Sequence, residues 1–418
     1  MPKARVLERE GVRRPASVPR LAWLIGPALV AGVAYLDPGN VASNMTAGAR
    51  FGYLLVWVVV LGNVMAWLIQ YLSAKLGVVT GESLPEVLGR RLRNRWGRRA
   101  YWLQAELVAM ATDIAEVIGG AVALNLLFGL PLLWGGAITG AVSISLLLVQ
   151  SRAGAQPFEF VVIGLVAIIA VGFTFGVFVA PPDPAGIVAG LVPRFEGTDS
   201  VLLAASILGA TIMPHAIYAH SALARDRFAQ ETGITTSRLL RATRWDVTIA
   251  MLIAGTVNLC ILLLAAANLD GVPGTDSLEG AYAALRDGIG PTVAVLFAVG
   301  LLASGLASTS VGAYAGAEIM HGLLHVRIPL VWRRLVTLVP ALAILAVGFD
   351  PTVALVLSQV VLSFGIPFAL VPLVALTARP ELLGRFRNRA ITTAAGIAAS
   401  IFLIVLNGLL LWLVFTGA

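Results

Sequence analysis

The sequence is poor in charge and in cysteine. Only 12% of its 418 residues are charged, against about 25% in an average soluble domain, whereas 58% are hydrophobic. The mean hydropathy is +0.90. The single cysteine, Cys260, lies in an apolar run, which excludes an internal disulfide and a cysteine metal cluster. This composition excludes a soluble protein and indicates a chain that lies largely within a membrane.

Several sequence patterns are also missing. Short segments of alternating hydrophobicity, which form membrane β-barrels, do not occur, and runs of about 20 apolar residues recur instead. No His-Glu-x-x-His pair can hold a catalytic zinc ion, and no Gly-Lys-Ser/Thr loop can bind ATP. The first apolar segment is too long for a signal peptide. We therefore expect an all-α polytopic membrane protein that is neither an intramembrane metalloenzyme nor an ATP-driven pump.

The apolar runs predict eleven membrane-spanning helices. They lie near residues 21–46, 53–78, 100–128, 132–150, 157–180, 200–224, 243–268, 291–321, 332–348, 352–378 and 390–415. If residues 1–20 form a cytoplasmic tail, all of the 29 Lys and Arg residues except Arg50, Arg194 and Arg286 fall on the cytoplasmic side. The net charge of +7 is then explained by orientation in a cell membrane rather than by nucleic acid, and the C-terminus is expected outside.

A break interrupts the first apolar segment at Asp37-Pro38-Gly39-Asn40. A carboxylate at this depth costs about 2.5–3.5 kcal/mol on insertion scales, so its presence needs a reason. Pro38 removes a backbone donor and Gly39 does not favour helix, so the helix should unwind and free carbonyl oxygens beside Asp37. Irregular backbone inside a membrane is tolerated where it is buried in protein or lines a cavity. We expect a cation site at the membrane midplane; the alternative is a kinked helix with Asp37 protonated or snorkelling.

A second break occurs in the sixth span, at Met213-Pro214-His215. It follows five helices that begin with the first break, and an odd number of helices in a repeat inverts the topology of the second half. Broken helices at matching places in inverted halves point to the central site of a transporter. We therefore divide the chain into repeats at 21–180 and 181–378, followed at 379–418 by a loop and an eleventh helix.

Placed face to face, the two breaks offer a mixed set of donors. Asp37 supplies a carboxylate, Asn40 an amide oxygen and Met213 a thioether, and carbonyls near Ala34 and Ala210 could add oxygens. Mg²⁺ and Ca²⁺ prefer shells of hard oxygen ligands, whereas sulfur favours first-row transition ions such as Mn²⁺ and Fe²⁺ and tolerates Co²⁺, Zn²⁺ or Cd²⁺. Alone, Met213 would be an ordinary packing residue.

The two motifs, in this order and in these surroundings, resemble the Nramp family of divalent-metal transporters, and the resemblance extends over about residues 20–415, including the segment 104–113. The bacterial manganese/proton symporters are the most similar. The resemblance implies a LeuT-like fold with ten helices in two inverted repeats, and import of Mn²⁺ or Fe²⁺ with protons. The ligands it implies are the side chains and carbonyls of Asp37, Asn40, Met213, Ala34 and Ala210. Gln359 matches a residue thought to reach the ion in some conformations.

Proton coupling needs titratable groups inside the membrane. Glu106, Asp113 and Glu116 share one face of the third helix, and crowded carboxylates do not all ionise easily, so they can hold a proton. Arg333 and Arg334 could balance them. The alternative is a structural salt-bridge lattice between the third and ninth helices. The resemblance assigns a proton route to Asp37, His215, Glu116 and Asp113, with Arg333 and Arg334 in the network.

His215 and His220 lie in and after the second break, where an imidazole titrates in a useful range. We interpret His215 as a proton relay or gate rather than a ligand, and His220 as a residue of the cytoplasmic exit path. Helix–helix hydrogen bonding is the default for the other intramembrane polar residues, Asn63, Gln70, Asn258 and Ser304. The two long external loops, near 181–199 and 269–290, are interpreted as solvated.

The metal is expected to be the cargo, so no cofactor, nucleic acid or obligate protein partner is implied. The remaining alternative keeps the fold and changes the cargo to a sodium-coupled organic solute. Such a site must hold an amine and a carboxylate, to which Asp37, Asn40 and Met213 are poorly suited.

Overall fold

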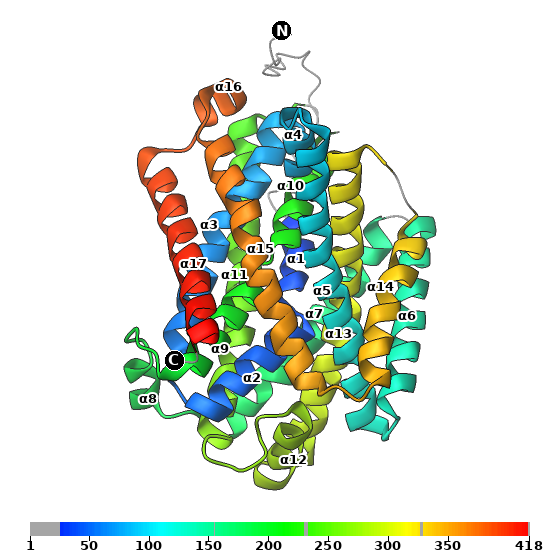
Figure 1. Cartoon of the computed structure of the whole chain (residues 1–418), viewed down its shortest axis with the longest axis vertical. Coiled ribbons are helices and arrows are strands. Elements are labelled where there is room, and N and C mark those ends of the chain that lie inside the picture. Colours follow the sequence, from blue (N-terminus) through cyan, green and yellow to red (C-terminus); the bar gives the residue numbers. More distant parts are fainter. Residues whose placement is uncertain (1–25, 154, 230–232, 327–328, 417–418) are drawn as a thin grey trace.

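The computed structural model describes residues 26–153, 155–229, 233–326 and 329–416, and these residues form helices and no strand. Most helices run along the long axis of the molecule and pack side by side (Figure 1). Nine long helices are each formed by one segment: α3 (Val56–Thr80), α5 (Arg95–Phe128), α6 (Leu132–Ala153), α7 (Ala155–Val179), α11 (Thr236–Asn268), α13 (Pro291–Leu324), α14 (Leu330–Ala346), α15 (Pro351–Thr377) and α17 (Ala390–Thr416).

The first and sixth predicted spans are broken. The first consists of α1 (Pro27–Gly32), the 3₁₀ turn η2 (Val33–Leu36) and α2 (Pro38–Phe51), and the sixth of α9 (Gly197–Thr211) and α10 (Pro214–Ala229). Both breaks fall at a proline, which begins the second half-helix because its missing N–H costs nothing there. Both predicted interruptions are confirmed as breaks in the helix.

Each of the eleven predicted spans thus contains helix. Among the described residues, seven helices are long and apolar enough to cross a membrane, and three apolar helices are shorter. The number that cross the membrane, the inverted repeats and the side on which each end lies therefore remain predictions. The tail predicted at residues 1–20 lies outside the described residues.

The short elements lie in predicted loops: α4 (Leu84–Arg91), α8 (Pro184–Ala189), α12 (Leu278–Gly288), α16 (Pro380–Leu383) and η3 (Gly384–Phe386). The expectation of two purely solvated external loops was wrong for the second. Its helix α12 buries Leu278, Ala281 and Leu285 and packs against α13. Spacing of three and four residues places these side chains on one face, a signal that the short length of the segment obscured.

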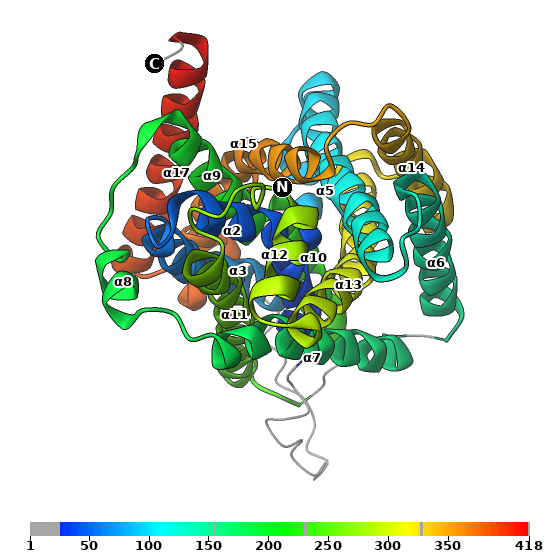
Figure 2. The ribbon, with the colours of Figure 1, turned by 90° about the horizontal axis from the view of Figure 1, so that it is seen from below.

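Burial separates a central pair of helices from a peripheral one. In the most apolar stretch of the α9–α10 span, 94% of the residues are buried, whereas 33% are buried in that of α17. Seen from below, α2 and α10 lie near the centre, and α6, α14 and α17 lie at the outside (Figure 2). Large apolar side chains such as Ile401, Val405 and Trp412 remain exposed on α17, as expected of a surface that faces lipid. The two broken helices are therefore surrounded by protein.

A candidate ion site between two broken helices

Asp37 forms the first break by capping the helix that follows it. Its backbone is extended, with φ −75° and ψ 164°, and its Oδ1 accepts a hydrogen bond of 2.8 Å from the backbone N–H of Asn40. A carboxylate at a helix N-terminus satisfies one of the free N–H groups and interacts favourably with the helix dipole. Asp37 is fully buried. The motif Asp-Pro-Gly-Asn therefore acts as the start of α2 as well as the end of η2.

The carbonyls freed by this break are held by side chains of other helices. Asn258 of α11 donates to the carbonyl of Tyr35 at 2.9 Å, and Ser304 of α13 donates to that of Leu36. The sequence predicted helix–helix bonding for Asn258 and Ser304, and they do join helices, but at the backbone of the break. They fix its shape at a depth where water cannot.

The second break lies between α9 and α10. Ile212 has φ −119° and ψ 50°, outside the helical region, and Pro214 starts the next helix. Met213 lies between them and its side chain is completely buried. The sulfur of Met213 therefore lies at a buried interruption of the backbone. In a regular helix it would lie on one face of that helix.

The two breaks contact each other directly. The side-chain amide of Asn40 donates to the Ala210 carbonyl at 2.9 Å and to Asp37 Oδ1 at 3.0 Å. One turn away, the hydroxyls of Ser43 and Ser206 lie 2.6 Å apart. The structure therefore brings Asp37, Asn40 and Ala210, which the sequence grouped, into one place.

Gln359 of α15 covers this junction. Its Nε2 donates to Asp37 Oδ2 at 3.2 Å. The approach depends on two glycines: a Cβ added to Gly39 would lie 1.7 Å from Gln359 Nε2, and one added to Gly209 would lie 1.9 Å from the Gln359 carbonyl. Gln359 is thus in contact with the Asp37 carboxylate.

Several buried oxygens in this junction have no hydrogen-bond partner. Asn40 Oδ1 and Gln359 Oε1 are both unpartnered, because each side chain uses its NH₂ group toward Asp37. Buried acceptors of this kind normally accept a hydrogen bond, and a buried acceptor left without one costs about 1–3 kcal/mol. Among the described residues there is no group of three or more His, Cys, Asp or Glu that could hold a metal ion. The junction itself brings together a carboxylate, two side-chain amides and a backbone carbonyl.

A charged lattice lies beside the junction, between α5 and α14. Arg333 contacts Glu106 at 2.9 Å and Asp113 at 3.4 Å, whereas Arg334 contacts Asp113 at 2.9 Å and Glu116 at 3.0 Å. The predicted grouping of three carboxylates with two arginines is therefore present, and it lies inside the protein. Three carboxylates face two guanidinium groups, and Glu116 Oε1 and Glu106 Oε2 have no hydrogen-bond partner.

His215 connects the second break to this lattice. Its Nδ1 lies 3.2 Å from the hydroxyl of Thr112, the neighbour of Asp113 on α5. His220 points elsewhere: its Nδ1 lies 2.7 Å from Gln70 Oε1, and Gln70 in turn donates to the hydroxyl of Tyr35 in the first break. The two histidines therefore have different neighbours. His215 lies toward the carboxylates of α5, and His220 lies toward the first break.

A family model shows to which family of proteins the chain belongs. The model described as Nramp, natural resistance-associated macrophage protein-like, matches residues 28–413.

The chain belongs to the Nramp family.

Two relatives support the assignment, and one more distant structure shares the fold. The divalent metal cation transporter MntH of Mycobacterium tuberculosis is 61% identical over 396 residues, covering 94% of this chain and 92% of that protein. The solved manganese transporter of Eremococcus coleocola has a TM-score of 0.82 at 32% identity, covering 97% of this Nramp chain and 88% of that one. Mhp1, a nucleobase-cation-symport-1 family transporter, has a TM-score of 0.62 at 14% identity, covering 97% of both chains. The predicted LeuT-like all-α fold is thus confirmed.

Several polar residues of this Nramp site were not predicted from the sequence. Tyr35, Thr112, Ser143 and Thr309 were not singled out, yet Ser143 and Thr309 accept hydrogen bonds from Arg334 at 3.0 and 3.2 Å. Hydroxyl-bearing residues are common in membrane helices and usually bond within their own helix, so the sequence carries no signal that separates these four.

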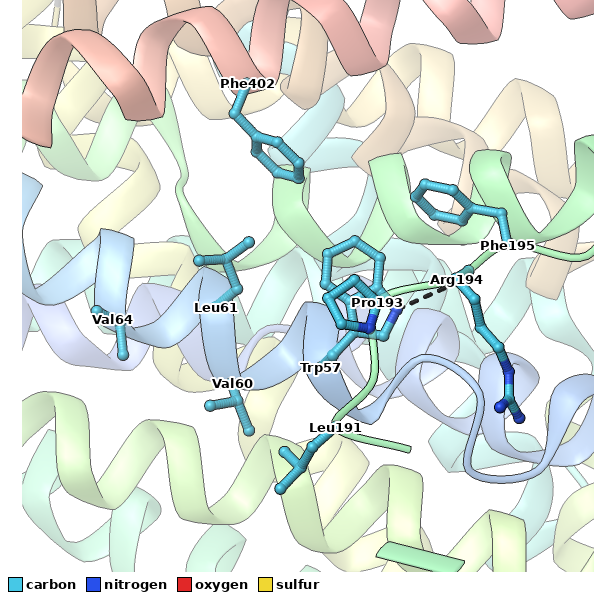
Figure 3. Close-up of a pocket in the computed structure, with 9 residues that line it drawn as sticks. All are labelled: Trp57, Val60, Leu61, Val64, Leu191, Pro193, Arg194, Phe195 and Phe402. Carbon is cyan, nitrogen blue, oxygen red and sulfur yellow. Dashed lines mark hydrogen bonds between the residues drawn. The ribbon is translucent and has the colours of Figure 1, made fainter. Parts of the chain in front are cut away.

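A groove on the outer surface of this Nramp chain lies apart from the junction. Trp57 and Leu61 of α3 and Phe402 of α17 line it, together with the segment 191–195 (Figure 3). Arg194 is its only charged residue, and the backbone carbonyl of Arg194 accepts a hydrogen bond from the Trp57 indole at 3.3 Å. An apolar groove without carboxylates does not suit a cation, so the candidate ion site is the buried junction.

Proposed function

We propose that this protein is a secondary active transporter that imports Mn²⁺ and related divalent transition ions, Fe²⁺, Cd²⁺, Co²⁺ and Zn²⁺, together with protons. The observation that carries the proposal is the junction of the two breaks, where Asn40 links Asp37 to the Ala210 carbonyl, three residues before the buried Met213. Both halves of the site come from interruptions of helices, the arrangement that transporters use at their central sites.

The ligand set explains the choice of ion. Asp37 provides the negative charge, and Asn40 and Gln359 each hold a buried oxygen without a hydrogen-bond partner, which is available to an ion. Met213 adds a soft ligand, which Mn²⁺ and Fe²⁺ accept and which Ca²⁺ and Mg²⁺ do not favour. The carbonyls of Ala34 and Ala210 complete the proposed shell, and Gln359 closes the site toward α15.

The charged lattice supplies the proposed proton route. Entry of a divalent ion beside Asp37 disfavours protonation of that carboxylate, so a proton leaves it for a group within reach. His215, next to Thr112, leads toward Asp113 and Glu116, and Arg333 and Arg334 compensate the remaining charge. Glu106 extends the same lattice through Arg333. His220, with Gln70 and Tyr35, belongs to the metal's cytoplasmic exit instead.

The transport cycle is alternating access in an inner cell membrane, with the N-terminus cytoplasmic and the C-terminus outside. The two repeats, 21–180 and 181–378, each contribute one broken helix, and their half-helices move to open one side at a time. A sodium-coupled organic-solute symporter of the same fold is disfavoured, because no residue of the junction offers a cation to bind a substrate carboxylate.

Uptake into proteoliposomes tests cargo and coupling together. The purified protein should take up Mn²⁺ in a saturable manner, faster when the external medium is acidic, and Fe²⁺ and Cd²⁺ should compete with Mn²⁺ whereas Ca²⁺ should not. Asp37→Ala should reduce uptake to the level of empty liposomes, because it removes the only charged ligand. Absence of uptake with Mn²⁺, Fe²⁺ and Cd²⁺ alike would refute the proposal.

A further inference from the structure

The N-terminus of α1 has no cap from its own segment. The first turn of a helix leaves free N–H groups that need acceptors. Gly26, which precedes α1, has no side chain to offer, and Pro27 has no N–H. At a buried helix end, water is a poor substitute, so the missing acceptor must come from elsewhere in the fold.

Asp246 of α11 supplies this acceptor from 220 residues away in the chain. Its Oδ1 accepts from the backbone N–H of Gly26 at 3.2 Å, and its Oδ2 accepts from that of Ala28 at 2.8 Å. Both oxygens of one carboxylate are thus used on one helix end, and the side chain is nearly inaccessible, at 2% exposed. Charge-assisted bonds of this kind are stronger than neutral ones, and the helix dipole adds to them.

The remaining contacts of α1 are apolar and close. A Cβ added to Gly32 would lie 3.3 Å from the Ala250 side chain, so α1 packs directly on α11. The buried residues of α1 are Pro27, Ala28, Val30, Ala31 and Gly32. Apolar packing has no strong directional preference, whereas the carboxylate bonds exist in one arrangement of the two helices only.

The two halves of the first broken helix are therefore held in different ways. The outer half, α2, is capped by Asp37, which is its own neighbour in the chain and moves with it. The inner half, α1, is capped by a residue of another helix, and any swing of α1 away from α11 breaks both bonds. The inner half of the second broken helix, α10, also packs against α1.

We propose that Asp246 is a latch for the cytoplasmic gate: it positions α1 against α11 while the ion site is closed, and its release permits α1 to swing and open the site inward. The inference rests on the proposed alternating-access function. Asp246 does not touch the junction itself; it sets the balance between the closed and the inward-open arrangement.

A buried reporter on α1 tests the latch without any metal. Ala31 is 1% exposed, so a cysteine placed there by Ala31→Cys, in a Cys260→Ala background, reacts with a membrane-impermeant maleimide only when α1 moves. In inside-out vesicles, Asp246→Asn and Asp246→Ala should each raise the labelling rate by about threefold or more. Asp246→Glu, which keeps the charge, should give an intermediate rate. A readout of labelling rather than uptake keeps this test separate from the metal and proton assay.

The matched control lies one turn earlier on α11. Thr243 is buried and donates to the Leu239 carbonyl of its own helix at 2.9 Å, so Thr243→Val removes a buried polar group without touching α1. It should label at the rate of the parent reporter. Equal rates in the parent, Asp246→Asn and Asp246→Ala would overturn the proposal, and so would acceleration in Thr243→Val as great as in the Asp246 variants. If Asp246→Ala does not yield folded protein, Asp246→Asn, which keeps the volume and one acceptor, decides the outcome.

Discussion

The side-chain amide of Asn40 donates to the backbone carbonyl of Ala210 at 2.9 Å, joining two helix breaks that lie 170 residues apart in the chain. Asn40 has a second NH₂ hydrogen, and this one is given to Asp37 Oδ1 at 3.0 Å. Its oxygen is thereby left without a partner. One amide thus joins two of the proposed ligands, Asp37 and the Ala210 carbonyl, and its own oxygen is a third.

Met213 should determine selectivity more than transport itself. Met213→Ala removes the thioether, and Met213→Leu removes it while keeping the volume. In both variants we expect the preference for Mn²⁺ over Ca²⁺ to fall about tenfold or more, with a smaller loss in the rate of Mn²⁺ uptake, because oxygen ligands remain for either ion. Competition of Ca²⁺ against Mn²⁺ uptake measures the preference. If Met213→Leu lost the preference for Mn²⁺ over Ca²⁺ and the rate of Mn²⁺ uptake to the same extent, the sulfur would have no selective role.

Replacement of Glu116 should affect proton coupling and leave metal binding largely unchanged. Glu116→Gln keeps the size of the side chain and removes the carboxylate whose Oε1 has no partner. We expect the dependence of Mn²⁺ uptake on external pH to flatten while the affinity measured by titration calorimetry changes little. Glu279→Gln, on α12 outside the lattice, is the control and should keep the normal profile. An unchanged profile in Glu116→Gln would favour the structural salt-bridge alternative.

Gly209 should not tolerate any side chain. In Gly209→Ala the new Cβ would lie 1.9 Å from the Gln359 carbonyl and 2.9 Å from the Ser363 nitrogen, both backbone atoms. Overpacking of this kind costs about 1–3 kcal/mol, so the thermal unfolding midpoint should fall and Mn²⁺ uptake with it. Gly164→Ala is the matched control, because nothing lies within 4 Å of its Cβ. It should leave stability unchanged or raise it by about 0.5–1 kcal/mol; a similar loss in both variants would contradict the close approach of α15.

Glu86 should make the stability of the protein sensitive to acid. Burial tends to raise the pKa of Glu86, but hydrogen bonds from Ser83 and the ion pair with Arg225, at 2.7 Å, outweigh burial and hold the pKa below its ordinary value of 4.5. A lowered pKa in the folded state contributes stability that is fully present above the ordinary pKa and is lost as the pH falls through the folded-state value.

The thermal unfolding midpoint across this pH range measures the effect of Glu86. Glu86→Gln should unfold at a lower temperature than the parent at neutral pH. The difference should shrink as the pH falls below about 4.5 and vanish below the lower folded-state pKa, where the parent carboxylate becomes protonated. Glu381→Gln, at an exposed position of α16, is the control and should follow the parent throughout. A difference for Glu86→Gln that grows in acid would show that the sign is wrong.

Much of the molecule was predictable from the sequence because a membrane restricts what the chain can do. Apolar runs longer than about 18 residues must be helices there, so the predicted spans all contain helix. Proline in the middle of two such runs predicts where they break, and Pro38 and Pro214 do begin the second half-helices. The weakest prediction was at the surface, where α12 proved to be a packed helix rather than a solvated loop.

The sequence by itself determined which residues are candidates for the site: Asp37, Asn40 and Met213 at breaks, and carboxylates at helical spacing on α5. Burying a charge or interrupting a helix in a membrane is costly, so such residues stand out wherever they occur. Only the tertiary structure decided which groups meet. Gln70 contacts His220, and Asp246 caps α1. Asn258 and Ser304 donate to the carbonyls freed by the first break. These contacts join segments far apart in the chain through ordinary polar residues, and hydrogen-bond geometry, unlike hydrophobicity, leaves no periodic trace in a sequence.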